Sequence, residues 1–432
     1  MTSSGRNLNE TAYDRERAEE RLWALARDRG IGRRRFLELL GVTGLGTLVG
    51  SCGRSRREPA SAPGTSRPSP TAADADDNLG GWVKPIGEDD FILHKTNAEM
   101  RWERMADGYT TPNARFFVRN HFKTARVDRA AWRLQVSGPA VTRPLELSYD
   151  ELVSMPGETT VTRFIECAGN ARVFFDEVGG RQAEGTQWRL GAIGVAEWTG
   201  VPLGAVLERA GVQPTARDVM PVGLDQVKVR RPIPLEKAMA DDTLLVYGMN
   251  GEDLPPDHGG PVRVLVPGWI GVANVKWVGQ IEVSDQPLYS DWNTTAYVLI
   301  GPGYFPAGQA KGPVLSSQVV KSALELPWPA TVPAGRQTLR GRSWSGGGSI
   351  TAVECRIDQE PWRPARLEGP NEPLAWARWS FEWDAPSGEH TVRVRAADSA
   401  GTTQPDTVPF NEQGYLYGGV VAHPVTVTPA QG

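Results

Sequence analysis

The stretch TRFIECAGNARVFF, residues 162–175, decides how this chain is interpreted. Apolar residues lead up to Cys167, as in a buried strand, and Ala-Gly-Asn then predicts a turn. The chain has only three cysteines, at 52, 167 and 355, too few for a disulfide framework, and no Cys/His spacing typical of zinc or haem sites. Taken alone, Cys167 is more often a structural core thiol than a ligand. Its role therefore depends on the rest of the chain.

The composition is that of a globular protein with more than one domain. The chain has 432 residues, of which 40% are hydrophobic and 23% charged. The 48 glycines and 34 prolines favour short strands and turns over long helices. A formal net charge of −4, with no Lys/Arg-rich face, gives no sign of nucleic-acid binding.

The N-terminal segment is predicted to be a targeting signal. Arg34 and Arg35 precede Phe36-Leu37 and a Gly-rich apolar run, which at about 15 residues is too short to span a membrane. This pattern resembles a twin-arginine export signal; an ordinary secretory signal or an anchor is the alternative. The run ends LVGSC, which resembles a lipobox with Cys52 as the lipidated residue, while simple cleavage nearby is the other reading.

The organisation expected from the sequence has four parts. Residues 1–52 form the signal, and residues 53–80, rich in Pro, Ser, Ala and charge, form a disordered tether. Residues 81–310 form a mixed α+β domain, and residues 311–432 a β-sandwich. Export and a lipid anchor would place the protein in the cell envelope, on the outer face of the cytoplasmic membrane.

Residue periodicity gives the expected elements of the α+β domain. Strands are predicted at 115–122, 261–269 and 275–285, and helices at 148–156 and 202–212.

The sandwich is predicted from alternation. In HTVRVRAAD, residues 390–398, Val392, Val394 and Ala396 share one face, and turn signals recur every 8 to 12 residues. Cys355 lies on such a strand and is expected to be a core thiol, with a second metal site as the remote alternative.

Several motifs together resemble the sulfite oxidase family of molybdenum enzymes. ECAGN is the family's metal-ligand motif, and the block GMNGEDLPPDHGGPVRVLVPGWIGVANVKWVGQIEV, residues 248–283, is the most specific match. FFVRNHF, TQWRLGAIG and DWNTTAYVLIG follow the family's order and spacing. The resemblance runs from about residue 95 to the C-terminus. It implies a molybdopterin domain followed by an immunoglobulin-like dimerisation domain, and hence a homodimer.

The resemblance implies a cofactor site for molybdopterin. Cys167 would be the protein ligand of molybdenum, because a soft thiolate suits a redox-active metal already bound by sulfur. The cofactor's phosphate is an anion that needs cationic and backbone donors. The residues implied for the phosphate and the pterin are Arg119, His121, Asp225, His258, Arg263 and Lys276. Read singly, the charged residues of this set could be solvated strand or turn residues.

The substrate implied by the family is sulfite or a related small oxyanion. The residues implied for its pocket are Arg119, Arg172, Trp188 and Tyr297. One position departs from the family: Gln413, in NEQGYLYGG, stands where vertebrate and plant members have an arginine. Losing that charge should weaken binding of a dianion by ~1–3 kcal/mol, which leaves the true substrate open.

The chain shows no His-Pro-Gly-Gly haem segment and no CxxCH, so no haem is predicted. Electrons would then pass to an external acceptor such as a c-type cytochrome. Two alternatives remain to the oxidation of sulfite. One is a sulfoxide reductase of the same superfamily acting on envelope proteins, whose members generally lack the C-terminal sandwich. The other is a non-catalytic envelope binding protein, which would not need to retain Cys167.

Overall fold

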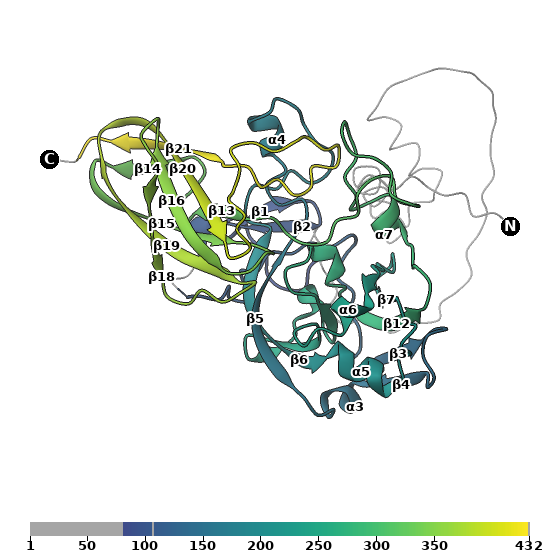
Figure 1. The fold of residues 1–432 in the computed structure, drawn as a ribbon. Coiled ribbons are helices and arrows are strands. Elements are labelled where there is room, and N and C mark those ends of the chain that lie inside the picture. The colour runs from purple at the N-terminus through teal and green to yellow at the C-terminus, as the bar shows by residue number, and fades with distance from the viewer. Residues whose placement is uncertain (1–80, 106–107, 431–432) are drawn as a thin grey trace, which may run out of the picture. The chain divides into compact units, whose positions relative to one another are not determined.

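The computed structural model describes residues 81–105 and 108–430 (Figure 1). The predicted export signal, Cys52 and the tether therefore lie outside the described residues. Within the described part, no helix is long and apolar enough to cross a membrane. The fold is mostly β with short helices, as the predicted combination of an α+β domain and a β-sandwich requires.

The first part of the fold is built on two sheets and a hairpin. In the sheet that carries Cys167, neighbouring strands run antiparallel in the order β10-β9-β6-β5, with β11 also paired to β9. Its strands are β5 (Thr159–Glu166), β6 (Ile193–Pro202), β9 (Leu244–Met249), β10 (Glu252–Asp253) and β11 (Arg263–Leu265). Strands β5 and β6 pair along their length, so the end of β5 has one fixed register (Glu166 opposite Ile193).

The second sheet has the order β4-β3-β12-β7-β8, in which β3 and β12 run parallel. Its strands are β3 (Arg133–Ser137), β4 (Leu145–Ser148), β7 (Asp218–Gly223), β8 (Ile233–Pro234) and β12 (Val278–Ser284). The hairpin consists of β1 (Phe91–His94) and β2 (Asn97–Met100).

The helices are short and lie between strands. They are α3 (Tyr149–Val153), α4 (Phe174–Glu177), α5 (Leu203–Arg209), α6 (Leu235–Ala238) and α7 (Asp291–Thr294), with 3-10 turns at Trp102–Arg104, Pro256–His258 and Gly271–Ala273. The predicted helices 148–156 and 202–212 form as α3 and α5, both shorter than expected. Ser148 caps α3 through a capping box with Glu151, which explains why the helix begins there.

The C-terminal part is a sandwich of two sheets with orders β13-β15-β19-β18 and β14-β21-β20-β16-β17. The strands are β13 (Lys321–Leu324), β14 (Ala330–Pro333), β15 (Gly335–Trp344), β16 (Ile350–Ile357), β17 (Arg363–Pro364), β18 (Arg366–Glu368), β19 (Trp376–Ala385), β20 (Gly388–Asp398) and β21 (Ala422–Thr428). Val392, Val394 and Ala396 are buried as the alternation predicts. Cys355 is a core thiol whose pKa is raised to about 12 by burial.

The sandwich packs on the first part through tryptophans and a returning chain segment. Trp344 and Trp376 join the core cluster that contains Trp102 and Cys167. Between β20 and β21 the chain returns to the first part, where the Leu416 amide donates to the carbonyl of Ala168. In Figure 1 this segment is the yellow loop beside α4. The predicted domain boundary at 310 falls in the stretch between α7 and β13.

The prediction of a strand at 115–122 is wrong. The segment forms a turn, and only Val118 makes a β-bridge, to Ala98. Phe116, Phe117 and Val118 are all buried, so the burial does not alternate as a half-buried strand requires. The segment bends because its apolar residues enter the core while Asn120 and His121 turn toward a pocket. The predicted strands 261–269 and 275–285 form as the shorter β11 and β12.

Candidate cofactor and substrate site

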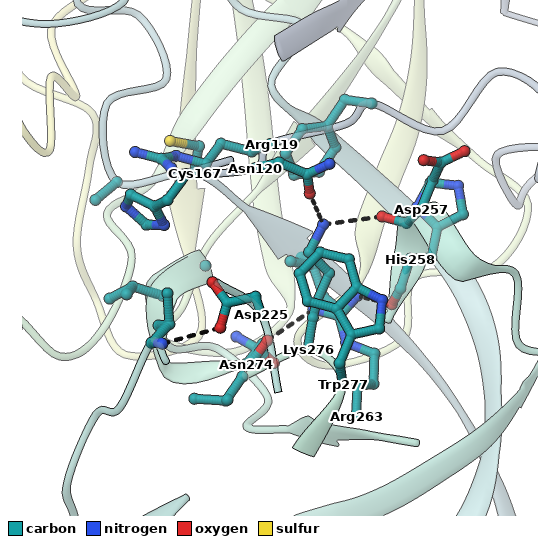
Figure 2. Close-up of a pocket in the computed structure, with 18 of the residues that line it drawn as sticks. Arg119, Asn120, Cys167, Asp225, Asp257, His258, Arg263, Asn274, Lys276 and Trp277 are labelled. Carbon is teal, nitrogen blue, oxygen red and sulfur yellow. Dashed lines mark hydrogen bonds between the residues drawn. The ribbon is translucent and has the colours of Figure 1, made fainter. Parts of the chain in front are cut away.

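A pocket lies where segments far apart in the sequence meet. It encloses about 720 Å³ of space not filled by atoms, part of which is open solvent. Its lining comes from six places in the chain and comprises Phe116, Phe117, Arg119, Asn120, His121, Ile165, Cys167, Ala168, Asp225, Val229, Asp257, His258, Arg263, Gly271, Val272, Asn274, Val275, Lys276, Trp277 and Tyr297. Figure 2 shows how Cys167, Arg119, Asp225, Arg263 and Lys276 of this set lie around the pocket.

Cys167 follows the last residue of β5 and lines the pocket. Its amide donates to the carbonyl of Ala192 at 2.9 Å, and its own carbonyl accepts from the amide of Asn170 at 3.0 Å. The first bond continues the pairing with β6, and the second closes the Ala-Gly-Asn turn. The side chain is 5% exposed and forms no disulfide. The strand and the turn together thus fix where this thiol enters the pocket.

Lys276 and Arg263 place buried positive charge in the same pocket. The Lys276 amine donates to the Asn120 side-chain oxygen and, at 2.8 Å, to the carbonyl of Asp257 (Figure 2). Arg263 donates to the carbonyls of His258 and Asn274 at 2.7 and 2.9 Å. Its Nε is buried with no hydrogen-bond partner among the described residues. Neutral oxygens thus hold both cations, and neither makes an ion pair with a carboxylate in the described structure.

Burial shifts the pKa values of these groups in the direction that disfavours charge. It lowers the pKa of Lys276 well below its usual value and that of Arg263 to about 9. The pKa of His258 lies well below its usual value, first through burial and then through Lys84 and Lys276, so this imidazole is neutral. Burial raises the pKa of Asp225, whose carboxylate accepts from the amide of Val229 at 3.0 Å. A pocket in which burial opposes several positive charges is suited to an anionic ligand that stabilises them.

Sequence reasoning missed Lys84, which contacts His258 from outside the pocket lining, and Asp257, which lines the pocket beside His258. The Lys84 amine donates to the carbonyls of Asn113 and Phe116 at 3.0 and 2.5 Å and lies 3.4 Å from Nε2 of His258. The amides of Val83 and Lys84 donate to the Asp257 carboxylate at 2.7 to 3.0 Å. Asp257 precedes His258 directly, which was a signal available in the sequence. Lys84 carried none, because its contact spans 174 residues.

Tyr297 closes another side of the pocket. Its hydroxyl lies 3.2 Å from Nε2 of His121, and its ring stacks on Tyr415 with centroids 5.1 Å apart. The Arg172 guanidinium lies over the ring of Tyr415, 5.3 Å from its centroid. Tyr297 has a backbone φ of 55°, a conformation that costs free energy for a residue with a side chain and is often found at functional sites.

Eight of the ten predicted site residues line the pocket; Arg172 and Trp188 do not. Arg172 is fully buried and donates to the carbonyls of Gln413 and Thr186 at 2.9 and 2.7 Å. Trp188 is also fully buried, and its Nε1 has no hydrogen-bond partner among the described residues. A direct role of either residue in binding substrate stays a prediction.

Gln413 also lies outside the pocket lining. Its side-chain amide donates to the carbonyl of Thr295 at 2.9 Å, two residues before Tyr297. Its Oε1 is buried without a hydrogen-bond partner in the described part of the chain. The position at which vertebrate and plant members of the family have an arginine therefore lies next to the segment that contains Tyr297.

Comparison with known proteins follows the same division of the chain. Residues 121–292 match the model of the oxidoreductase molybdopterin binding domain, and residues 316–420 match that of the Mo-co oxidoreductase dimerisation domain. Sulfite oxidase of Gallus gallus is 37% identical over 331 residues, which cover 72% of both chains. The chain belongs to the sulfite oxidase family.

Other similar proteins show how far this similarity extends. Mitochondrial sulfite oxidase of Homo sapiens is 37% identical over 72% of this chain, but the match spans only 60% of that enzyme. Nitrate reductase of Hordeum vulgare is 32% identical over 75% of this chain, and the match spans 40% of that enzyme. The crystal structure of the sulfane dehydrogenase SoxCD from Paracoccus pantotrophus superimposes with a TM-score of 0.69 at 29% identity, covering 83% of this chain and 95% of that one.

The residues of the pocket fit the molybdopterin that the sulfite oxidase family binds. Within residues 81–105 and 108–430, no three His, Cys, Asp or Glu side chains gather to hold a metal ion. A metal needs only one thiol from the protein when an anionic organic ligand supplies its other donors, and the buried cations suit that anionic ligand. Gly271 keeps room beside Cys167, because an added Cβ would lie 2.9 Å from the Glu166 carbonyl and 3.4 Å from Cα of Cys167.

Proposed function

We propose that this protein oxidises sulfite, or a related small sulfur compound, with a molybdopterin-bound metal held by Cys167. The observation that carries the proposal is the pocket itself, in which one thiol and the buried cations Arg263 and Lys276 line the same cavity. Similarity to proteins named sulfite oxidase and sulfane dehydrogenase supports a sulfur substrate.

The chain's own residues would divide the work within this pocket. When bound, the cofactor would supply a two-electron acceptor and the oxygen atom transferred to sulfur. Arg263, Lys276 and neutral His258 would hold its phosphate end, because backbone carbonyls already fix two of these side chains. Asp225 would accept hydrogen bonds from the pterin ring.

Arg119 and Tyr297 would bind the substrate oxyanion. Both line the pocket, and the Tyr297 hydroxyl is held by its contact with His121. Arg172 supports Tyr297 through Tyr415, so we assign it a positioning role at minimum. A small, largely buried pocket strengthens such contacts, because little water competes for the anion.

The proposal extends to the setting of the reaction. Two electrons would leave to an external acceptor such as a c-type cytochrome, because no haem motif is found in the sequence. The dimerisation-domain match supports a homodimer. The Arg34-Arg35 motif and Cys52 support export by the twin-arginine route and a lipid anchor in the cell envelope. Replacing both arginines with lysine should then leave the protein in the cytoplasm.

The decisive experiment is to express the protein in a host that makes molybdopterin and to measure its molybdenum content and its sulfite:ferricyanide activity. We expect bound molybdenum and sulfite-dependent reduction of ferricyanide. Bound molybdenum without sulfite turnover, but with reduction of methionine sulfoxide, would favour the sulfoxide reductase. Absence of molybdenum from the wild-type protein would favour a non-catalytic binding protein.

A further inference from the structure

The strongest unassigned feature is a buried charge cluster directly behind Cys167. Glu166, the last residue of β5, has a carboxylate that is 0% exposed and lies 2.6 Å from the Lys321 amine, which is 1% exposed. Lys321 lies on β13 of the C-terminal sandwich. The pair therefore joins the strand that carries the thiol to the other part of the fold.

The Glu166 carboxylate is fully engaged by specific donors. Its Oε1 accepts from Lys321 and, at 2.9 Å, from the Asn170 side chain, and its Oε2 accepts from Nε1 of Trp344 at 3.0 Å. Lys321 and Trp344 are cross-strand neighbours on β13 and β15, so two adjacent sandwich residues reach the same carboxylate. A further contact comes from Gln318, just before β13, whose side-chain amide donates to the backbone carbonyl of Glu166 at 2.8 Å.

The same donors hold both ends of the turn that follows Cys167. Lys321 also donates to the Asn170 carbonyl at 3.2 Å. The Asn170 amide closes the turn on the Cys167 carbonyl, and its side-chain oxygen accepts from the amide of Ala192 at 3.0 Å. Lys321 therefore fixes both ends of the segment from Cys167 to Asn170. It binds Asn170 directly, and it binds Glu166, the residue before Cys167.

Stability alone does not account for this arrangement. A buried ion pair contributes little net stability, because desolvation of both charges offsets their attraction, and apolar residues of similar volume often serve as well. What such a pair supplies is a defined geometry. Its position next to the only cysteine of the pocket gives that geometry a use.

We propose that Glu166 and Lys321 are positioning residues that orient Cys167 for the metal, so that the C-terminal sandwich controls the metal-ligating turn. The inference rests on the proposed role of Cys167 as the metal ligand. It adds a role for the sandwich at the active site, beyond joining subunits.

The test uses the double variant Glu166→Gln/Lys321→Met in the full-length protein. Removing both charges together avoids leaving one buried charge unpaired, which would threaten folding. The matched control is Glu325→Gln/Arg342→Met, a second largely buried pair of the sandwich, 2.6 Å apart, whose arginine donates to the carbonyls of Tyr109 and Gly108 in the first part of the fold. Both variants are compared with wild type by thermal unfolding without cofactor.

Three measurements separate positioning from stability. We expect the Glu166/Lys321 variant to unfold near the temperature of the control. We also expect it to bind molybdenum about 10- to 100-fold more weakly, as for loss of residues that orient a ligand. The thiolate-to-metal absorption band of what remains bound should shift. Wild-type metal content and an unchanged band in the folded variant would overturn the proposal.

A further readout does not depend on the cofactor. The rate at which iodoacetamide alkylates Cys167 in the folded, cofactor-free protein, with Cys52 and Cys355 replaced by alanine, reports the orientation and exposure of the thiol. We expect this rate to change severalfold in Glu166→Gln/Lys321→Met and not in the control. If wild type binds no molybdenum, the proposed function fails, and this rate still decides the positioning role: an unchanged rate would contradict it.

Discussion

At the residue scale, Cys167 is set apart by its neighbours rather than by its own exposure. Cys167 and Cys355 are both buried thiols outside any disulfide. Cys355 is surrounded by the apolar sandwich core, while Cys167 shares a pocket with Arg263 and Lys276. The same side chain is therefore inert in one place and a potential ligand in the other.

Replacing Cys167 with serine tests that difference. The two side chains are close in size, so the cofactor-free protein should stay folded, while molybdenum content and sulfite turnover should fall to background because the soft ligand is lost. Cys355→Ser is the matched control and should keep both. Retention of wild-type activity in Cys167→Ser would exclude this cysteine as the ligand.

Lys84 predicts a pH dependence of stability. Burial lowers its pKa to about 7, while the Asp257 carboxylate opposes part of the shift. Between pH 7 and about 10.5 the unfolded chain binds a proton that the folded chain does not, so the cost of burying this charge falls and stability rises with pH. Lys84→Met should therefore flatten the rise in the free energy of unfolding of the cofactor-free protein, measured by urea denaturation at pH 7, 8 and 9.

The exposed Lys123→Met is the control for Lys84→Met. It should leave the slope of stability against pH as in wild type. Equal slopes for Lys84→Met and wild type would show that Lys84 keeps an ordinary pKa in the folded protein.

The structure shows where the positive charge that Gln413 lacks would lie relative to the pocket. An arginine there would lie next to Thr295, to whose carbonyl Gln413 now donates, and near the Tyr297 side of the pocket. Gln413→Arg should lower the KM for sulfite, because it adds a donor and a positive charge for a dianion. Steady-state kinetics check this, and an unchanged KM would place the position outside the reach of substrate.

At the element scale, the segment between β20 and β21 links the sandwich to the substrate side of the pocket. Tyr415 from this segment stacks on the ring of Tyr297 and also contacts the guanidinium of Arg172. The Tyr415 amide and carbonyl are both bound by Asn411, which fixes the segment locally.

Tyr415→Leu should loosen Tyr297 without removing any residue of the pocket lining. We expect kcat/KM for sulfite to fall about tenfold, because the stack that holds the Tyr297 ring contributes ~0.5–1.5 kcal/mol beyond its buried area. Tyr415→Phe keeps the ring and should remain near wild type. Similar losses in both variants would point to the hydroxyl instead of the stack.

At the scale of the whole molecule, the fold assembles the pocket from segments separated by up to 181 residues, as from Phe116 to Tyr297 (297 − 116). A ligand bound there contacts β5 and β11 of the first sheet and Trp277, the residue before β12 of the second sheet. Strand β5 is in turn linked to the sandwich by Glu166 and Lys321. Binding to the folded state alone should therefore stabilise the whole described fold.

Removing the cofactor should lower the melting temperature, and the loss should be larger at pH 6.5 than at pH 8.5. Burial lowers the pKa of Lys84 to about 7 and also lowers the pKa of Lys276, so an anion in the pocket favours the protonated amines and binds more strongly as the pH falls. Differential scanning calorimetry of loaded and cofactor-free protein at the two pH values measures this. A difference independent of pH would argue against an anionic ligand in the pocket that Lys276 lines.

The sequence by itself determined the two-part fold and the set of residue types in the pocket. Strand alternation identified the sandwich, because period-two burial is a local property of a half-buried strand. Cys167, His258, Arg263 and Lys276 lie within or near strands whose register follows from the chain, so motif order was enough to group them.

Only the tertiary structure decided which residues act from behind the pocket. Segment 115–122 is a turn because core packing overrides its local alternation. Glu166 meets Lys321 across 155 residues, and Lys84 meets His258 across 174. Such contacts depend on how sheets and segments pack, and no local spacing in the chain encodes them. The kind of chemistry was thus readable from the sequence, whereas the orientation of the groups that perform it required the folded chain.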